Sequence, residues 1–288
     1  MANNNFPKVF IIVLNFNGSS VLSNCLKSIM QSDYPNFEVV LVDNNSTDSS
    51  FEQAKNDFSR FHFIKNSENI GFSRGNNIGI RFALEKFADL VFILNNDTII
   101  DKNTISTLAK TSKQYKKSGI ITPLILEGDN KKVWFAGGKI NWCTMKTSHV
   151  TKVSSKKPYK SEYLSGCAML IKKDVFKKIG LFDERFFLYY EDTDFSMRAK
   201  KAGFDLLIDP SATIQHLEQS ELNAEKIYYL VISGLLFFKT HASFLQKIWL
   251  YFYILLRKIK NTIDVLAFHK PIATEVRRAY GDYKKLLN

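Results

Sequence analysis

The sequence contains little cysteine and no apolar run long enough to serve as a leader near its start. Its three cysteines, Cys25, Cys143 and Cys167, are not spaced as metal ligands, and three are too few for a disulfide framework. The apolar run Val9–Leu14 is too short to form the core of a signal peptide. We therefore expect a protein of a reducing compartment, located in the cytoplasm.

Two glycine signatures of nucleotide binding are also missing. The pattern G-x-x-x-x-G-K-[ST] does not occur, which excludes a P-loop ATPase. Gly71, Gly75 and Gly79 form a glycine-spaced turn and helix start, but they lack the G-x-G-x-x-G spacing of a dinucleotide-binding turn. Any nucleotide must therefore be held by another arrangement.

Acidic residues are scarce relative to basic ones, and the formal net charge is +12. Residues 221–288 hold 11 Lys and Arg against 5 Asp and Glu, so half of the net charge lies in the last quarter of the chain. An excess of basic over acidic residues is typical of proteins that bind nucleic acid, anionic lipid or an anionic substrate. We expect no nucleic-acid partner, because no recognition motif is present and the basic residues lie beside apolar stretches.

The first hundred residues alternate between strands and helices. Apolar runs predict four buried strands, at Val9–Leu14, Glu38–Val42, Phe61–Ile64 and Leu90–Leu94, and helical patterns separate them. Such alternation is typical of an α/β fold with a mostly parallel sheet flanked by helices. With 45% apolar residues in 288, the chain can bury a full core.

Polar residues follow three of these strands directly. They are Asn15 and Asn17, Asp43 and Asn45, and the triplet Asn95-Asn96-Asp97. Because ligands of parallel α/β sheets bind beyond the carboxyl ends of the strands, we expect the three clusters to meet at one edge.

Asp97 and His216 are candidate metal ligands. A carboxylate at a strand end can bind Mg²⁺ or Mn²⁺ together with phosphate oxygens and water, and a histidine ligand suits Mn²⁺. The alternative for Asp97 is a turn residue that accepts hydrogen bonds from backbone amides, and the alternative for His216 is a structural histidine.

Glu191 and Asp192 begin a predicted helix that ends at Gly203. Carboxylates in a first helical turn are stabilised by the helix dipole and need no catalytic role. The other interpretation is a general base at the mouth of the crevice, with its pKa raised by the aromatic residues at 186–190.

The second half of the chain has a less regular pattern. Its polar, Lys-rich segment 145–160 predicts a mobile loop, and Tyr163–Ile171 predicts a strand. Lys173–Ile179 predicts a short helix that ends at Gly180, and Leu206–Ile208 and Ala212–Gln215 predict two short extended pieces.

Taken in order, the motifs resemble one family. The ordered set is VLNFN, LVDNNSTD, NIGFSRGNN, FILNND, YLSGCAMLI, YYEDTDFSMR and HLEQS. It is similar to the inverting GT-A glycosyltransferases of the bacterial family 2 type, and most similar to their rhamnosyltransferase-like branch. The resemblance covers residues 8–220 and implies a GT-A domain over 1–220, followed by a basic, amphipathic helical extension over 221–288.

The resemblance also implies roles for individual residues. On the donor side it implies that Asn15 and Asn17 border the nucleotide, that Asp43 contacts the pyrimidine or ribose near Asn45, and that Gly71, Arg74 and Asn76 close over the nucleotide-sugar. Asn95-Asn96-Asp97 occupies the place of the DxD motif, so Asp97 is its one clear carboxylate ligand for Mn²⁺ or Mg²⁺, with His216 as a second ligand. Asp192 matches the catalytic base next to Glu191, and Trp134, Gly166 and Cys167 lie where the sugar and acceptor pockets form.

The implied reaction is one inverting displacement. A sugar, with rhamnose favoured, would move from a dTDP- or UDP-sugar to a hydroxyl of a glycan or lipid-linked acceptor in cell-surface polysaccharide synthesis. Two alternatives remain: a sugar nucleotidyltransferase, disfavoured because NFNGSS at residues 15–20 has no basic residue to hold a triphosphate, and a non-catalytic scaffold that binds nucleotide-sugars.

The tail carries two apolar stretches, Ile227–Phe238 and Phe244–Leu256, both shorter than a membrane span. Arg257, Lys258 and Lys260 follow directly. This pattern favours helices within 225–260 that lie in a membrane interface, which would place the protein peripherally on the inner face of the cell membrane. The alternative is a pair of core helices or the interface of a homodimer.

Overall fold

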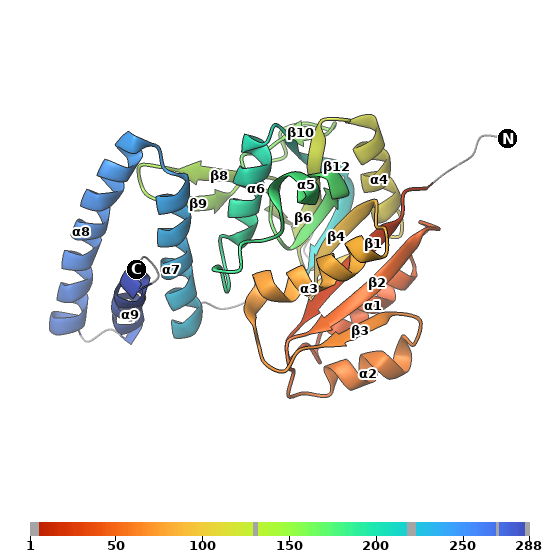
Figure 1. Cartoon of the computed structure of the whole chain (residues 1–288), viewed down its shortest axis with the longest axis horizontal. Coiled ribbons are helices and arrows are strands. Elements are labelled where there is room, and N and C mark those ends of the chain that lie inside the picture. The colour runs from red at the N-terminus through yellow and green to blue at the C-terminus, as the bar shows by residue number, and fades with distance from the viewer. Residues whose placement is uncertain (1–5, 129–131, 218–222, 269–270, 286–288) are drawn as a thin grey trace.

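The structure is a computed structural model that describes residues 6–128, 132–217, 223–268 and 271–285. A central sheet with helices on both faces forms the main body, and three helices form an extension at one side of it (Figure 1). The sheet has the order β10-β12-β6-β11-β4-β1-β2-β3. The predicted α/β class, a mostly parallel sheet flanked by helices with a C-terminal helical extension, is confirmed.

The predicted βα repeat builds the parallel half of the sheet. Its strands are β1 (Val9–Asn15), β2 (Phe37–Asp43), β3 (His62–Lys65) and β4 (Leu90–Asn95), and its helices are α1 (Leu22–Met30), α2 (Ser50–Asp57) and α3 (Gly71–Glu85). β1 lies between β2 and β4, and all three pair in parallel. The register aligns Asn15 with Asp43 and Leu14 with Asn95, so the polar strand ends are neighbours.

The other half of the sheet is mixed. It contains β5 (Thr98–Ile100), β6 (Ser118–Glu127), β7 (Lys132–Phe135), β10 (Tyr159–Lys160), β11 (Ala168–Lys172) and β12 (Asp205–His216), with α4 (Thr104–Gln114), α5 (Lys173–Ile179) and α6 (Glu191–Lys201) beside it. β11 joins the halves, because it pairs antiparallel with both β4 and β6. β5 pairs antiparallel with the end of β12, so the chain re-enters the sheet only two residues after β4.

Three predictions for this half are wrong in detail. The predicted mobile loop 145–160 contains β9 (Lys146–His149), which pairs with β8 (Gly138–Asn141), and also the edge strand β10. The strand predicted at Tyr163–Ile171 begins only at Ala168, because the preceding turn bends to meet α6. The two extended pieces at 206–215 are one strand, with a register shift between Asp209 and Thr213.

The main core lies on both faces of the sheet. β1 and β4 are almost fully buried, which explains why their sequences are continuous apolar runs. A second core joins the hairpin, the aromatic turn before α6 and the C-terminal helices, and its buried members are Met145, Phe186, Leu235, Leu236, Phe237, Phe238, Leu250, Tyr280 and Tyr283.

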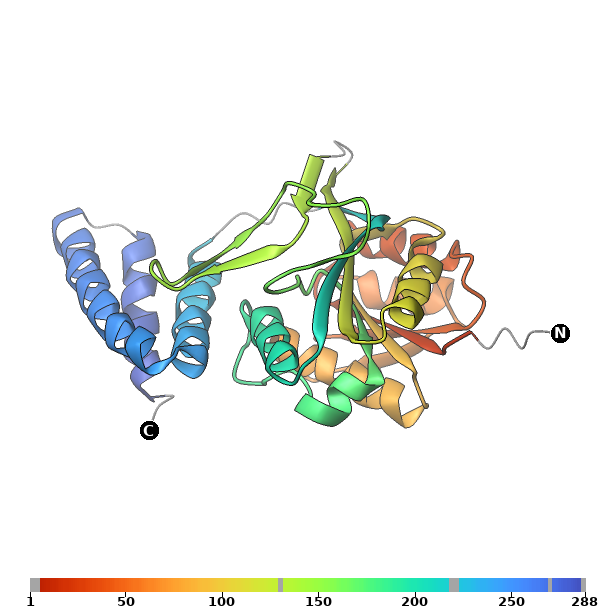
Figure 2. The same cartoon turned by 90° about the horizontal axis from the view of Figure 1, so that it is seen from above.

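The C-terminal extension has three helices, not the two that its apolar stretches predict. They are α7 (Ala224–His241), α8 (Phe244–Phe268) and α9 (Pro271–Lys285). The β8–β9 hairpin reaches across to them (Figure 2), and Trp249 Nε1 of α8 donates to the carbonyl of Cys143 at 2.7 Å. The predicted boundary at 220/221 lies outside the described residues.

Half of the predicted membrane segment lies in this second core. The C-terminal half of α7 is buried there, with Phe237 and Phe238 among its most enclosed side chains. Among the described ranges, no helix is both long enough and apolar enough to cross a membrane.

Candidate functional site

The polar strand ends meet at one edge of the sheet, as predicted. Asn96 Nδ2 donates to Asn15 Oδ1 at 2.9 Å, and Asn15 Nδ2 donates to Asp43 Oδ1 at 2.9 Å. Asn15 and Asp43 are fully buried. Asn96 is therefore connected through Asn15 to the loop that follows β2, and its side-chain amide donates to a neighbour.

Asp43 lies buried at this edge of the sheet and is held by the loop that follows it. Its Oδ2 accepts from the backbone N–H of Ser46 at 2.9 Å, and its Oδ1 also accepts from Ser46 Oγ at 2.6 Å. These bonds fix the loop that carries Asn45, which is exposed and adopts a left-handed backbone with φ 61°. Asn17 is exposed in the same way with φ 52°, and its Oδ1 accepts from the Thr47 N–H at 2.8 Å. The exposed side-chain amides of Asn17 and Asn45 thus border this edge of the sheet, next to the buried carboxylate of Asp43.

Asp97 and His216 are brought together from sequence positions far apart. The turn after β4 carries Asp97, and the pairing of β5 with β12 places Thr98 opposite His216. Asp97 Oδ2 lies 3.1 Å from His216 Nε2, and each side chain is 14% exposed. Asp97 Oδ1 is buried and has no hydrogen-bond partner among the described residues.

This pair fits a divalent cation that is completed by other ligands. Within the described ranges no group of three or more His, Cys, Asp and Glu side chains could hold a metal ion. Mg²⁺ and Mn²⁺ need only one or two protein ligands when phosphate oxygens and water supply the rest. The buried, unpartnered oxygen of Asp97 is the atom whose desolvation such an ion would offset.

Asp192 lies in the first turn of α6 and is held by three donors. The N–H of Gly166 donates to Oδ2 at 2.8 Å, and the N–H and Oγ1 of Thr193 donate to Oδ1 at 2.6 and 3.0 Å. A Cβ on Gly166 would lie 3.3 Å from Asp192 Cβ and 3.2 Å from the Phe72 ring, so any larger residue would have to displace these neighbours by a few tenths of an ångström. Burial raises the pKa of Asp192, and the three hydrogen bonds partly oppose that rise.

Glu191 is more deeply enclosed than its neighbour. It is 5% exposed, and its Oε2 has no hydrogen-bond partner in the described part of the chain. Burial raises the pKa of Glu191 well above its usual range, and the adjacent charge of Asp192 adds to the rise. The enclosed, unpartnered carboxyl of Glu191 thus favours its protonated form.

The turn before these carboxylates is strained. Tyr189 and Tyr190 both have left-handed backbones, with φ 69° and 65°, which bulky residues rarely adopt. The carbonyl of Phe187 accepts from the Phe72 N–H at 2.7 Å, which ties the turn to the start of α3. Gly71 permits this contact, because it has φ 81° and a Cβ there would lie 2.6 Å from the Phe187 carbonyl.

Arg74 and Asn76 lie on α3, beyond this contact. The Arg74 side chain is 57% exposed and forms a long ion pair, with Nε 3.7 Å from Glu184 Oε2. Asn76 is buried and donates to the Phe72 carbonyl at 3.0 Å, and its Oδ1 has no partner among the described residues. Arg74 therefore lies at the surface of α3, and Asn76 lies on its buried side.

The Gly166-Cys167 turn connects the two candidate centres: the N–H of Asn95, two residues before Asp97, donates to the Cys167 carbonyl at 3.0 Å, and the N–H of Gly166 donates to Asp192. Cys167 is buried, and burial is the main reason that its pKa is raised well above the usual value. The charges of Asp97 and Asp192 both add to this rise, so both carboxylates lie near its sulfur. Burial therefore disfavours the thiolate, which is the nucleophilic form of a cysteine.

Trp134 covers the metal pair, together with a residue that sequence reasoning missed. Its ring centroid lies 4.7 Å from that of His216 and 4.4 Å from that of His149. Burial lowers the pKa of His149, and the nearby His216 lowers it further. No sequence signal could identify His149, because it lies on β9, in the segment predicted to be a loop.

A cavity of about 340 Å³ lies beside Tyr190, between the hairpin and the C-terminal helices. Its walls are mostly apolar, and Lys146 and Arg257 supply positive charge. It is lined by Met145, Lys146, Thr147, Tyr190, Leu230, Val231, Gly234, Leu235, Phe238, Leu250, Tyr253, Arg257 and Tyr280. The predicted site residues do not line it, because it depends on the predicted loop and on the extension.

Comparison with known families gives one match. The sequence profile described as "Glycosyl transferase family 2" matches residues 10–180. This range includes the strand ends, α3, Asp97 and the Gly166-Cys167 turn, and it stops before Asp192 and His216.

Three curated relatives are similar over the same region. A low-salt glycan biosynthesis hexosyltransferase, Agl10 of Haloferax volcanii, is 30% identical over 201 residues, covering 68% of this chain and 62% of the relative. The dTDP-rhamnosyl transferase RfbF of Shigella flexneri is 27% identical, covering 72% and 68%. An N-acetylglucosaminyl-diphospho-decaprenol L-rhamnosyltransferase of Mycobacterium tuberculosis is 25% identical, covering 72% and 75%. The chain thus spans less than two thirds of the first of these relatives.

Two solved structures share the fold. GalNAc-T7 with UDP, GalNAc and Mn²⁺ superposes with a TM-score of 0.72 at 18% identity, covering 98% of this chain and 55% of the other. S. aureus TarS 1–349 in complex with UDP-GlcNAc superposes with a TM-score of 0.63 at 17% identity, covering 96% and 80%.

Proposed function

Because the chain belongs to glycosyl transferase family 2, we propose that it is a metal-dependent inverting glycosyltransferase. The single observation that carries the proposal is that one turn, Gly166-Cys167, is hydrogen-bonded both to Asn95, at the strand end next to the Asp97–His216 pair, and to Asp192. A leaving group and an attacking hydroxyl need two such centres on either side of one reacting carbon.

Asp97 and His216 are the residues that would hold Mn²⁺ or Mg²⁺. When bound there, the ion supplies Lewis-acid neutralisation of the charge that develops on the departing diphosphate. Asn15 and Asp43 fix the two loops above, and their exposed amides, Asn17 and Asn45, are placed to border the nucleotide. The exposed guanidinium of Arg74 has the fork geometry that suits phosphate oxygens.

Asp192 acts as the general base. Its carboxylate accepts the proton of the acceptor hydroxyl while that oxygen attacks the anomeric carbon, and the carbon–diphosphate bond breaks on the opposite face. The configuration is inverted in one step, so a second carboxylate near the reacting carbon is not needed, in contrast to glycosidases. Burial raises the pKa of Asp192, which strengthens it as a base, and burial also raises the pKa of the neighbouring Glu191, which favours the uncharged form of that side chain.

The donor is a dTDP- or UDP-sugar, with rhamnose favoured. Support comes from two relatives that are named as rhamnosyltransferases, one of them for dTDP-rhamnose, and from solved neighbours that contain UDP or UDP-GlcNAc. Trp134, above His216, and the Gly166-Cys167 turn are placed to shape the sugar pocket.

The acceptor is a hydroxyl of a glycan or of a lipid-linked sugar in cell-surface polysaccharide or cell-wall synthesis. One relative is named for a sugar on diphospho-decaprenol. The cavity beside Tyr190 supports this class, because it combines apolar walls with the cations Lys146 and Arg257. We propose that residues 1–220 form the transferase domain, and that the extension 221–288 brings it to the cytoplasmic face of the membrane.

A thermal-shift panel tests the proposal. The diphosphates dTDP, UDP, GDP and CDP are each added with and without Mn²⁺ or Mg²⁺, since a ligand of the native state raises its melting temperature. We expect a shift with a pyrimidine diphosphate that grows with metal and disappears in Asp97→Ala. Asp174→Ala is the matched control, because this carboxylate is 66% exposed on α5 and pairs there with the exposed Lys177 rather than with a residue of the site.

Three outcomes would contradict the proposal. No shift with any diphosphate would refute it, and a shift without sugar release on adding acceptor extracts would favour the non-catalytic scaffold. A larger shift with a nucleoside triphosphate than with the diphosphate would favour the sugar nucleotidyltransferase.

A further inference from the structure

Helix α8 exposes large apolar side chains along one side. They recur every three or four residues and are 45–75% exposed: Leu245, Ile248, Phe252, Leu255, Leu256, Ile259, Ile263 and Leu266. We call this set the α8 stripe. At 1.5 Å per residue it is about 30 Å long.

The opposite side of α8 is already occupied. Leu250 and Asn261 are buried, and Tyr253 and Ile254 pack against the second core. Asn261 Nδ2 also donates to the carbonyl of Ala273 on α9 at 3.1 Å. The helix is therefore fixed by one apolar side and exposes a second one. Figure 1 shows α8 beyond α7, at the end of the molecule away from the sheet.

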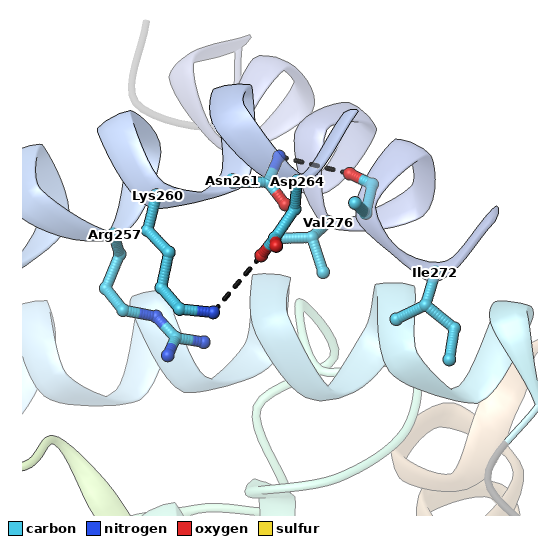
Figure 3. A pocket seen from close by; sticks show the side chains of 7 residues that line it. Arg257, Lys260, Asn261, Asp264, Ile272 and Val276 are labelled. Atoms are coloured by element: carbon cyan, nitrogen blue, oxygen red, sulfur yellow. Dashed lines mark hydrogen bonds and ion pairs between the residues drawn. The ribbon is translucent and has the colours of Figure 1, made fainter. Parts of the chain in front are cut away.

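Positive charge borders the α8 stripe. Lys260 lies toward one border and Lys258 and Lys247 toward the other, whereas Arg257 lies on the side that faces α7 and α9; Asp264 is the one carboxylate within Phe244–Phe268. Figure 3 shows Arg257 and Lys260 beside a cavity of about 340 Å³ between α8 and α9, with Lys260 Nζ 3.1 Å from Asp264 Oδ2. Long basic side chains in this position can reach headgroup phosphates while their stems stay in apolar surroundings.

We propose that the α8 stripe lies in the interface of an anionic lipid bilayer, with α8 parallel to the membrane plane. An amphipathic helix of this kind buries its apolar side at the boundary of headgroups and acyl chains. Trp249 and Tyr251, near the borders of the stripe, are residue types that favour this depth. The use of this contact for a lipid-linked acceptor rests on the proposed function, but the contact itself does not.

A second copy of the chain fits the α8 stripe less well than lipid does. In a two-fold pair of α8 helices, parallel or antiparallel, the middle of one stripe meets the middle of the other. Lys258 and Lys260, which border the stripe, lie close to that middle, so each would face the same cations of its partner. Anionic headgroups instead complement these charges.

The geometry connects this surface to the transferase site. Arg257 lines both the cavity beside α9 and the cavity beside Tyr190. Tyr190 precedes Asp192 by two residues. A sugar whose lipid remains in the bilayer under α8 would thus approach the base past Arg257 and Tyr190.

Vesicle flotation of the full chain tests the proposal. Phosphatidylcholine vesicles with and without phosphatidylglycerol are mixed with the wild type, Phe252→Glu and Phe87→Glu. Phe87 is the matched control, because it is 85% exposed on the transferase body and undergoes the same chemical change as Phe252, which is 52% exposed on the stripe. Circular dichroism melting checks that each variant folds.

We expect the wild type and Phe87→Glu to float with the anionic vesicles, more weakly at high salt, and Phe252→Glu to lose about tenfold or more in its partition. Equal flotation of Phe252→Glu and wild type would overturn the proposal. So would a wild type that does not float but sediments as a dimer, with Phe252→Glu a monomer, because that result assigns the stripe to a second copy. Nucleotide thermal shifts of Phe252→Glu remain at wild-type size if only the membrane contact is lost, which separates this result from failure of the proposed transferase function.

Discussion

Asp192→Asn separates the chemistry of this residue from its place in the fold. The new amide keeps its oxygen for the two donors of Thr193, at 2.6 and 3.0 Å, and its NH₂ then faces the N–H of Gly166, which now donates to Oδ2 at 2.8 Å. One buried hydrogen bond becomes a contact between two donors, which costs about 1–3 kcal/mol of stability. For a chain of this size we expect the melting temperature to fall by a few degrees, so the variant stays folded at assay temperature.

The effect on catalysis is much larger than the effect on stability. A general base contributes about 10²–10⁴-fold to the rate, or about 3–5 kcal/mol of activation free energy. We expect kcat of Asp192→Asn to fall by that factor. Nucleotide binding, measured by thermal shift, stays within about twofold, because Asp192 lies on the acceptor side of the site.

The pH profile supplies a second measurement. Because burial raises the pKa of Asp192, the wild type loses activity as the pH falls through a value above the usual range of aspartate, when the base becomes protonated. The pH dependence of stability runs the other way from that of activity. A carboxyl whose pKa is raised in the folded state stabilises the fold at low pH, and this contribution disappears as the pH rises through that pKa. Asp192→Asn should lose both the acidic limb of activity and this part of the stability profile. An Asp192→Asn enzyme within threefold of the wild-type kcat, or with the same acidic limb, would falsify the assignment.

Three further predictions concern the neighbours of this base. Thr193→Val removes the Oγ1 donor at 3.0 Å and keeps the backbone one, so the pKa of Asp192 rises and the acidic limb of kcat moves to higher pH; an unmoved limb contradicts this positioning role. Glu191→Gln removes a buried carboxyl whose pKa is raised. The melting temperature of this variant should therefore fall less than that of the wild type as the pH rises from about 5 to 8, and parallel profiles of the two proteins would argue against this. Gly71→Ala places a Cβ 2.6 Å from the Phe187 carbonyl at φ 81°, which costs about 2–5 kcal/mol from strain and overpacking and should lower the melting temperature by several degrees; an unchanged melting temperature would show that the turn relaxes freely.

The parallel half of the fold could be predicted from sequence because its signals are local. A strand buried on both faces reads as an apolar run, and polar residues directly after such a strand must lie at the carboxyl edge of a parallel sheet. This reasoning placed Asn15, Asp43 and Asn96 together, and their hydrogen bonds confirm it. It did not anticipate that Asp43 would be fully buried, because burial of a strand-end carboxylate depends on the next loop closing over it.

The hairpin that carries His149 could not be predicted, because its stability is not local. β9 is Lys146–His149, a polar segment with a single paired neighbour, and such a hairpin alone is marginal in water. It is held by Trp142, which packs on Phe237 with ring centroids 6.2 Å apart, and by the bond from Trp249 to Cys143. Those partners lie about a hundred residues later in the chain, so a local pattern contains no information about them.

The same dependence on distant residues applies to the strained turn that positions Asp192. Left-handed backbones at Tyr189 and Tyr190 cost of order 1–3 kcal/mol each, so packing elsewhere must offset them. Contacts with α7 of the extension supply the free energy that offsets this strain. Ser233 Oγ donates to the Leu188 carbonyl at 2.8 Å, and the centroid of the Tyr190 ring lies 5.4 Å from that of Phe237.

One residue of the extension also reaches α6 itself. His241 Nε2 lies 2.7 Å from Asp194 Oδ1, two residues after Asp192 and one turn before Arg198, whose Nε binds the other oxygen of Asp194 at 2.7 Å. Contact with lipid alone would not require a histidine of the extension to be buried against this carboxylate of α6. The extension therefore has two sides with different tasks: α7 holds the turn and the helix that carry Asp192, and α8 leaves an apolar stripe for another surface. Changes on the α7 side should consequently alter sugar transfer even to a water-soluble acceptor, whereas changes confined to the α8 stripe should not.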